Sequence, residues 1–113
     1  MRKSCAVILL FMIVLSFSVT SIAGAVFTHS YHAHKESVSV TVSGGTYDIT
    51  IRTLVCSSSG LVLDEDEAHL SSMSSGTVSI YSYDPQAAFG FYSYRIANNN
   101  NGNEHFESSG IDT

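Results

Sequence analysis

Three histidines close together are the first residues in this sequence that could do chemistry. His29, His32 and His34 lie in the segment Val26–Lys35 with the spacing H-x-x-H-x-H. Side chains alternate between the two faces of an extended strand, so His32 and His34 would share one face and His29 would lie across from them. Imidazole nitrogens are good ligands for zinc and copper. The spacing therefore makes this segment a candidate for a transition-metal site.

The same segment is also typical of a polar N-terminal arm with solvated histidines. No cysteine or carboxylate completes an obvious local set of four ligands, although folding could bring His69 or His105 near. Three ligands on a flexible arm would have to be ordered on binding, which weakens the complex. We therefore expect solvated histidines, no zinc or copper binding tighter than micromolar, and no assignable metal ligand.

Four consecutive acidic residues, Asp64–Glu67, suggest a second kind of metal chemistry. Calcium is a hard cation that takes carboxylate oxygens. However, the alternating acids and central glycine of an EF-hand loop are absent. Adjacent carboxylates on an extended chain also point to opposite sides. We therefore predict a solvated acidic loop rather than a calcium site.

The sequence motifs of common enzymes are missing. There is no G-x-S-x-G nucleophile elbow, no H-E-x-x-H zinc helix and no glycine-rich phosphate loop. Serine is so frequent that a catalytic triad could be drawn almost anywhere, and a domain this small offers only a shallow cleft. We predict a protein that is not an enzyme, with no catalytic residue, no cofactor-binding residue and no cofactor.

The elements that would position these residues are organised around Ser37–Val55. Valines alternate with Ser and Thr before Gly44-Gly45, and Tyr47, Ile49 and Ile51 alternate with polar residues after it. Period-2 alternation of β-branched and aromatic residues predicts strands. A two-glycine connection suits a tight primed turn. The predicted hairpin pairs Val38 with Ile51, Val40 with Ile49 and Val42 with Tyr47.

Further strands are expected downstream. The second strand should extend to Cys56, and the other strand segments are Leu61–Leu63, Thr77–Tyr83, Ala88–Ile96 and Glu104–Ser108. The connections should be one helical turn at Glu67–Leu70, a flexible stretch at 71–76, an Asp84-Pro85 turn, an Asn-rich loop at 98–103, and a frayed end at 109–113. In the Ala88–Ile96 strand, Gly90 should mark a bulge or a close approach of another backbone.

Together these elements predict an all-β fold. We expect a small antiparallel β-sandwich or barrel of five or six strands, preceded by a hydrophobic N-terminal signal helix.

The N-terminus has the three regions of a secretory signal peptide. Arg2 and Lys3 precede the apolar run Ala6–Leu15, and Ala23-Gly24-Ala25 supplies a small-residue cleavage site. The alternative is a retained membrane anchor over residues 5–27, but a spanning helix needs about 20 predominantly apolar residues. We expect cleavage after Ala25, or otherwise after Ala23. Residues 1–25 would then be the signal peptide and 26–113 a single secreted β domain.

The mature domain is small and acidic. Its 88 residues suffice for one domain, and three basic residues stand against ten acidic ones, a net charge of −7 with histidine neutral. Such a surface repels phosphate and anionic lipid, which excludes nucleic acid as a partner. Membrane contact is expected only through the N-terminal segment if it remains uncleaved.

Only Cys56 remains in the mature domain, which therefore has no pair of cysteines of its own. Small secreted domains commonly use disulfides to supplement a modest core. We predict that Cys56 is a buried free thiol that packs as a small hydrophobic residue.

Tyrosines offer the best predicted binding surface. Aromatic side chains provide a large contact area at low entropy cost. An exposed tyrosine face could contact a protein or a cell-wall glycan, although the rings could equally cover the core. The residues concerned are Tyr81, Tyr83, Tyr92 and Tyr94.

Two segments resemble known secreted proteins. The tract Gly90–Asn98, closing on Asn101-Gly102, resembles the end of small secreted cysteine-poor β proteins of Gram-positive bacteria that have no assigned activity. The His-rich start followed by Ser37–Val40 is similar to secreted bacteriocins of the lactococcin kind, although this chain lacks their tryptophans and basic charge. Neither resemblance supplies a functional residue, and from the tyrosines we predict a small secreted protein that is a non-enzymatic extracellular binding or structural module. A bacteriocin-like antagonist or a His-mediated metal-binding protein are the alternatives.

Overall fold

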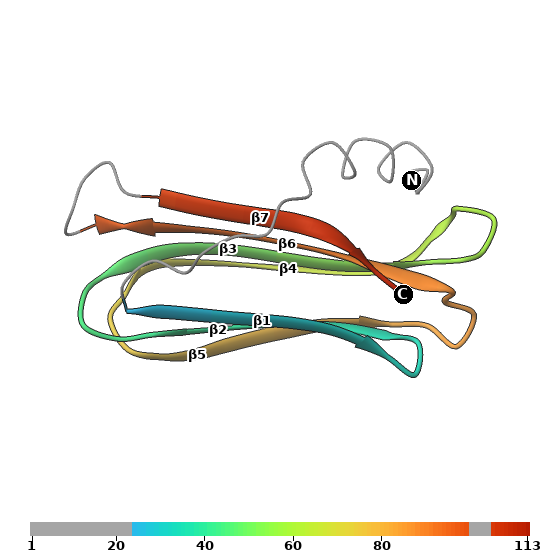
Figure 1. Cartoon of the computed structure of the whole chain (residues 1–113), viewed down its shortest axis with the longest axis horizontal. Helices are drawn as coiled ribbons and strands as arrows, with labels where there is room; N and C mark the ends of the chain where they lie inside the picture. The colour runs from blue at the N-terminus through green and yellow to red at the C-terminus, as the bar shows by residue number, and fades with distance from the viewer. Residues whose placement is uncertain (1–23, 100–104) are drawn as a thin grey trace.

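A computed structural model describes residues 24–99 and 105–113 of the chain (Figure 1). It is all-β, as predicted, with two antiparallel sheets of strand order β1-β2-β5 and β4-β3-β6-β7. Within the described ranges, no helix has the length and apolar character needed to cross a membrane. The predicted signal helix lies outside these ranges. The strands are β1 (Ala25–His32), β2 (Lys35–Val42), β3 (Tyr47–Cys56), β4 (Val62–Met73), β5 (Gly76–Tyr83), β6 (Phe89–Asn98) and β7 (His105–Asp112).

There are seven described strands rather than five or six, because the predicted N-terminal arm is itself a strand. β1 pairs with β2 along its whole length, from Ala25 opposite Val42 to His32 opposite Lys35. The turn between them is Ala33-His34, whose φ angles are both positive, at 52° and 69°. Neither is a glycine, although positive φ favours glycine at such a turn. The sequence therefore contains no glycine or asparagine that would predict a turn where this hairpin reverses.

The predicted hairpin between β2 and β3 is wrong. The two strands belong to different sheets, and β2 pairs with β1 and β5 while β3 pairs with β4 and β6. The loop around Gly44-Gly45 therefore carries the chain from one sheet to the other (Figure 1), and only Gly44 has a positive φ, at 72°. The predicted alternation is nevertheless correct, because alternation determines which side chains are buried and does not determine the partner strand.

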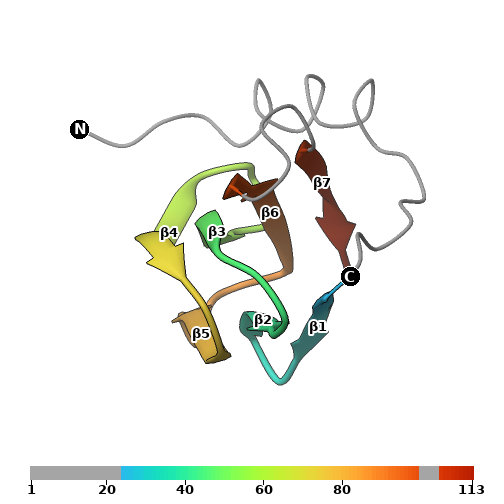
Figure 2. The same ribbon diagram turned by 90° about the vertical axis from the view of Figure 1, so that its left-hand side faces the viewer.

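The inward faces of both sheets contribute to one core cluster, and Figure 2 shows the sheets one above the other. β2 supplies its three valines, and β3 supplies Tyr47, Ile49 and Ile51. One polar contact also joins the sheets inside the protein, a hydrogen bond of 2.7 Å between the buried hydroxyls of Thr53 on β3 and Ser82 on β5. A second cluster of buried residues surrounds Phe91 near one end. Apolar burial and a buried hydroxyl pair thus hold the sheets together.

Cys56 belongs to the second cluster and is fully buried, as expected. The prediction of a free thiol is wrong, since Cys56 is disulfide-bonded. The partner in that bond lies outside the described residues.

Two stretches predicted to be irregular, 64–70 and 109–113, belong almost entirely to strands. The acidic run and the predicted helical turn Glu67–Leu70 both lie within β4, which continues to Met73. The predicted frayed end belongs to β7, which pairs with β6 as far as Asp112 opposite Gly90. Ladder hydrogen bonds order both segments despite their polar composition. The Asp84-Pro85 turn is confirmed, since the Asp84 carbonyl and carboxylate accept hydrogen bonds from the backbone N–H groups of Ala87 and Gln86.

Replacing Ile49 with alanine should destabilise the domain strongly. Ile49 is 1% exposed within the main cluster, so truncation leaves a cavity and lowers the free energy of unfolding by about 2–5 kcal/mol. Thr50→Ala is the matched control: its partly exposed hydroxyl bonds only His69 on the outer face, so the loss should stay under about 1 kcal/mol. Denaturant unfolding of both variants measures the difference. Equal losses at the two positions would contradict the burial assigned to Ile49.

Candidate functional site

The structure separates the three N-terminal histidines. His34 lies in the turn rather than on a strand face, with its Nδ1 2.8 Å from the carbonyl oxygen of Ala87. His32 ends β1 on the outer face, and His29 lies further back on the inward side of the same strand. His69 is on β4 in the other sheet, where its ring contacts Thr50 and Glu67 at 3.0 and 2.9 Å. These four histidines therefore do not converge on one another, and the side chain of His105 lies outside what the structure describes.

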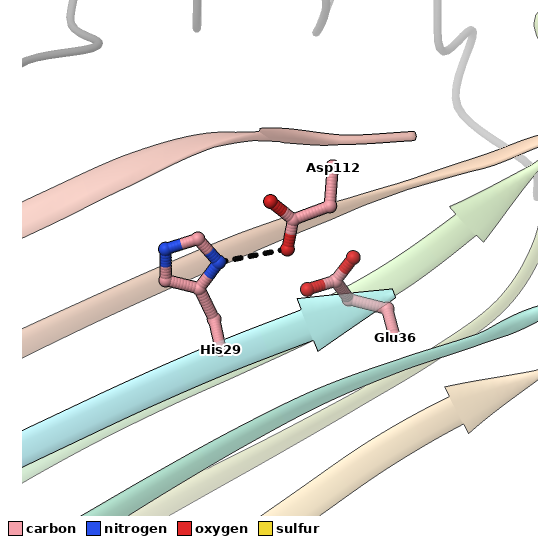
Figure 3. Close-up of side chains that lie close together, drawn as sticks. All are labelled: His29, Glu36 and Asp112. Carbon is pink, nitrogen blue, oxygen red and sulfur yellow. Dashed lines mark hydrogen bonds and ion pairs between the residues drawn. The ribbon is translucent and has the colours of Figure 1, made fainter. Parts of the chain in front are cut away.

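His29 instead meets two carboxyl groups that lie far from it in the sequence (Figure 3). Its Nδ1 is 2.8 Å from Oδ2 of Asp112, the last residue of β7. Glu36, on β2, points its carboxyl group toward the same point. One imidazole nitrogen and one oxygen from each carboxyl group all lie within 4.8 Å of one another. We refer to His29, Glu36 and Asp112 as the acid–histidine cluster, and they are the described residues that could hold a metal ion.

Glu36 is the unusual member of the cluster because it is completely buried. Its side chain is 0% exposed, and in its ionised form neither carboxyl oxygen has a hydrogen-bond partner among the described residues. A Cβ at Gly90 would collide with the Glu36 side chain, so the glycine provides the space that this side chain fills. The close approach predicted at Gly90 is therefore made by a side chain and not by another backbone. Burial raises the pKa of Glu36 from 4.5 to about 10, and the Asp112 carboxylate adds to the rise by accepting a hydrogen bond from the protonated acid and by its negative charge.

Two tyrosines of β6 lie next to the cluster, Tyr92 in contact with His29 and Tyr94 in contact with Tyr92. The Tyr92 ring stacks on the His29 ring with centroids 3.6 Å apart and planes 13° from parallel. Tyr94 is 5% exposed in the main core cluster. Burial raises the pKa of both tyrosines, and hydrogen bonding to Ser108 partly opposes the rise. Tyr92 and Tyr94 therefore do not form the exposed binding surface that the sequence suggested.

Tyr81 and Tyr83 are exposed, at 59% and 47%. They lie on the outer face of the β1-β2-β5 sheet, where Tyr81 is opposite Ser37 and Tyr83 is opposite Lys35. The Lys35 ammonium is 5.2 Å from the centroid of the Tyr81 ring, within the range of a cation–π contact. A hollow of about 260 Å³ opens beside these residues. Its lining is Ser30, His32, Ala33, Lys35, Ser37 and Tyr83.

The rest of this outer face carries rows of hydroxyl groups. Ser39 and Ser79 form a hydrogen bond of 2.7 Å across β2 and β5. Thr41 and Thr77, the neighbouring pair on the same face, form one of 2.8 Å. Each hydroxyl has one donor and two acceptor positions, so these pairs retain acceptor capacity toward solvent or a ligand.

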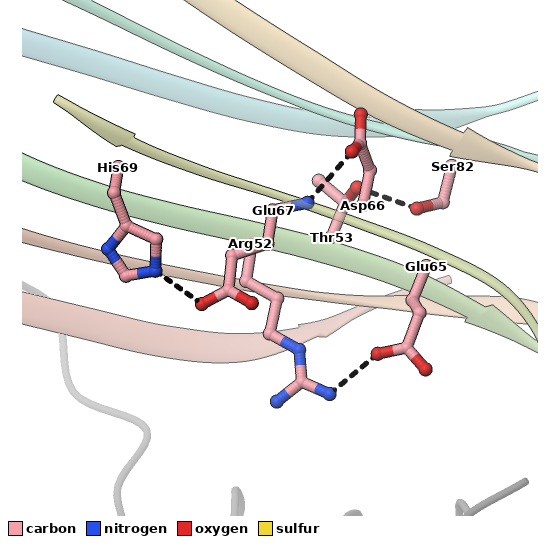
Figure 4. Close-up of polar contacts among 7 residues, drawn as sticks. All are labelled: Arg52, Thr53, Glu65, Asp66, Glu67, His69 and Ser82. Atoms are coloured by element: carbon pink, nitrogen blue, oxygen red, sulfur yellow. Dashed lines mark hydrogen bonds and ion pairs between the residues drawn. The ribbon is translucent and has the colours of Figure 1, made fainter. Parts of the chain in front are cut away.

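The acidic run does not gather into a cation site. All four side chains are exposed along β4 and bond to different partners, and Figure 4 shows the contacts of Glu65, Asp66 and Glu67. Glu65 pairs with Arg52 at 2.8 Å, and Glu67 pairs with His69 at 2.9 Å. Asp64 accepts a hydrogen bond from the backbone N–H of Tyr83 at 2.9 Å. The prediction of solvated acids is correct, although they lie on a strand and not in a loop.

Glu36 and Asp112 are the two site residues that sequence reasoning missed. Glu36 did carry a signal, because it is in phase with Val38, Val40 and Val42 and therefore had to lie on the buried face of β2. Asp112 carried none, since it is 83 residues from His29 and lay in a predicted frayed end.

Comparison with known proteins gives no relative from which function could be carried over. No protein-family model matches the chain, and no curated protein matches it. Among solved structures, the chain is similar to a β-glucuronidase from Bacteroides uniformis at 8% identity and a TM-score of 0.35. The match covers 78% of this chain and only 12% of that chain. A likeness this slight carries no argument about fold or activity.

Neutralising Glu36 should remove a pH dependence of stability. The folded pKa is about 10 against 4.5 when unperturbed, so the folded state binds the proton more tightly. The stabilisation is complete below about pH 4.5 and is lost as the pH rises toward 10. Glu36→Gln should therefore flatten the stability profile and be more stable than wild type at pH 8. Thermal unfolding from pH 5 to pH 9 in chelator-treated buffer measures this, since each 1 kcal/mol shifts the Tm of a small domain by about 4–8 °C.

Glu107→Gln is the control for that comparison, because Glu107 lies on β7 with its side chain 64% exposed. It should keep the wild-type profile. If Glu36→Gln and wild type have the same profile, the carboxyl group is ionised and solvated in the folded protein.

Proposed function

We propose that this chain is a secreted, non-enzymatic β-sandwich module that binds an extracellular glycan through the outer face of its β1-β2-β5 sheet. The observation that carries the proposal is the pair Tyr81 and Tyr83, two large exposed rings on one face beside the hollow. Contiguous exposed apolar surface rimmed by polar residues is typical of binding sites, and aromatic rings supply such surface at low entropy cost.

The sandwich is supported by the distribution of the core. Residues from both sheets form one cluster of buried side chains, and the chain passes between the sheets after β2, β4 and β5. Two antiparallel sheets that bury their inner faces against each other leave polar outer faces. The outer face of β1-β2-β5 fits this description, because most of its side chains carry hydroxyl groups.

A glycan suits this face better than a protein does. The face presents rings that can stack on sugar residues and rows of hydroxyl groups that can form hydrogen bonds with them. Among its paired residues only Val26 has an aliphatic side chain, so the face offers little of the apolar surface that a protein partner would bury. The hollow of about 260 Å³ is smaller than the ~300–1,000 Å³ of pockets that enclose a whole ligand. The hollow therefore suits one part of a longer glycan. The acidic mature domain disfavours an anionic polymer, so the expected ligand is a neutral glycan.

Glycan binding should depend on the two exposed tyrosines. Tyr81→Ala and Tyr83→Ala should each weaken binding about tenfold, because truncating an aromatic residue at a binding hot spot costs roughly 1–2 kcal/mol. The measurement is co-sedimentation with insoluble cell-wall polysaccharides, followed by titration with soluble fragments. Leu61→Ala is the matched control, since Leu61 is 52% exposed and lies in the β3–β4 loop. Undiminished binding by the double tyrosine variant would show that this face is not the glycan site.

Secretion is supported by the three N-terminal regions together with the start of the fold. Ala25 is the first residue of β1 and is 2% exposed, and the carbonyl of Gly24 accepts a hydrogen bond from the N–H of Ser43 at 2.8 Å. Cleavage after Ala25 would remove both groups from the domain. Cleavage after Ala23 would keep them. The fold therefore favours the second of the two cleavage points.

The mature protein should begin at Gly24. N-terminal sequencing and intact mass of the extracellular protein measure this directly. A full-length species in the membrane fraction would show that the N-terminal segment is retained, and a start at Val26 would show that the Gly24 and Ala25 contacts are dispensable.

A further inference from the structure

The carboxyl group of Glu36 is fully buried where its ionised form has no hydrogen-bond partner among the described residues. Only the protonated acid has one, because it can donate a hydrogen bond to the Asp112 carboxylate. A buried polar group without a partner costs free energy that its replacement by an apolar side chain would recover. The glycine at position 90 makes room for this carboxyl group rather than excluding it. The ionised Glu36 carboxylate therefore lacks a partner in the part of the chain that the structure describes, and a cation at this point would supply one.

The carboxyl group is directed at two further ligand groups (Figure 3). The Asp112 carboxylate and the His29 imidazole complete a set of one nitrogen and two oxygens whose atoms lie within 4.8 Å of one another. Zinc–ligand distances of about 2.0–2.2 Å place the ligand atoms of a tetrahedral site about 3.4 Å apart. The three ligand atoms, which lie within 4.8 Å of one another, would each have to approach the others by at most about 1.4 Å to reach that spacing.

We propose that His29, Glu36 and Asp112 bind a zinc ion that joins the free edges of the two sheets. The imidazole nitrogen favours zinc over calcium or magnesium, which take oxygen ligands and more of them. Three protein ligands and one water molecule make a complete tetrahedral shell. This site is distinct from the proposed glycan face, since its side chains lie on the inward side of the hairpin that β1 and β2 form.

The position of the cluster gives the ion a structural role. β1 is an edge strand of one sheet and β7 is an edge strand of the other, and Figure 2 shows them side by side. His29 and Asp112 come from these two edges, and Glu36 lies at the bottom of the site on β2. The side chains of His29 and Asp112 remain 31% and 17% exposed, which leaves a path for the ion from solvent. A bound ion would hold the edges together as a crosslink does.

Zinc titration of the chelator-treated mature protein tests the proposal. Calorimetry should show one zinc ion per chain and thermal unfolding should show a higher Tm with zinc, while calcium and magnesium at the same concentration should leave the Tm unchanged. His29→Ala and Asp112→Asn should each weaken zinc binding at least tenfold. His32→Ala and Glu107→Gln are the matched controls, because they remove a histidine and a carboxylate from the same two strands outside the cluster. Both should bind zinc as wild type does.

Glu36→Gln separates metal binding from a merely structural role. This variant should fold and gain stability at neutral pH without metal, yet it should lose zinc binding and the zinc-dependent rise in Tm. The proposal is overturned if wild type shows no zinc-dependent shift in Tm at up to millimolar zinc. It is equally overturned if Glu36→Gln retains wild-type affinity, or if His32→Ala weakens binding as much as His29→Ala.

Discussion

The fold depends on the alternation of side chains along β2 and β3. Val38, Val40 and Val42 point inward from one sheet, and Tyr47, Ile49 and Ile51 point inward from the other. A slip of one residue in either strand would move its whole apolar set to solvent. Every other strand is arranged around these two faces. β2 is the centre of its sheet and β3 is an inner strand of the larger one.

The same alternation places the carboxyl group of Glu36 inside the protein, where the free-energy cost of desolvating it is greatest. Glu36 is in phase with the valines of β2, so the strand cannot bury the valines without burying Glu36. Desolvation strongly disfavours the charged form, which explains the direction of its pKa shift. Gly90 on β6 removes the Cβ that would otherwise occupy the same space. Two independent positions thus accommodate the acid, and this agreement argues that its burial serves a purpose other than stability.

The sequence predicts the strands and their buried faces well, and their partners poorly. Alternation is a local property, and it identified β2, β3, β5 and β6. Pairing is a long-range property, and two glycines between alternating runs are equally compatible with a hairpin and with a passage between sheets. The hairpin that does form turns at Ala33-His34, where no glycine or asparagine marks the reversal. Polar composition concealed strand structure in β1, β4 and the end of β7, because ladder hydrogen bonds are independent of side-chain polarity.

The two proposed sites share one hairpin, and alternation explains how. In β1 and β2, His29 and Glu36 point inward, while His32 and Lys35 point outward to line the hollow. The backbone between these residues is common to both faces. An ion that fixes the inward side chains would also reduce the freedom of the outward ones, and a preordered surface loses less conformational entropy when a ligand binds. The acid–histidine cluster would then support glycan binding without touching the glycan.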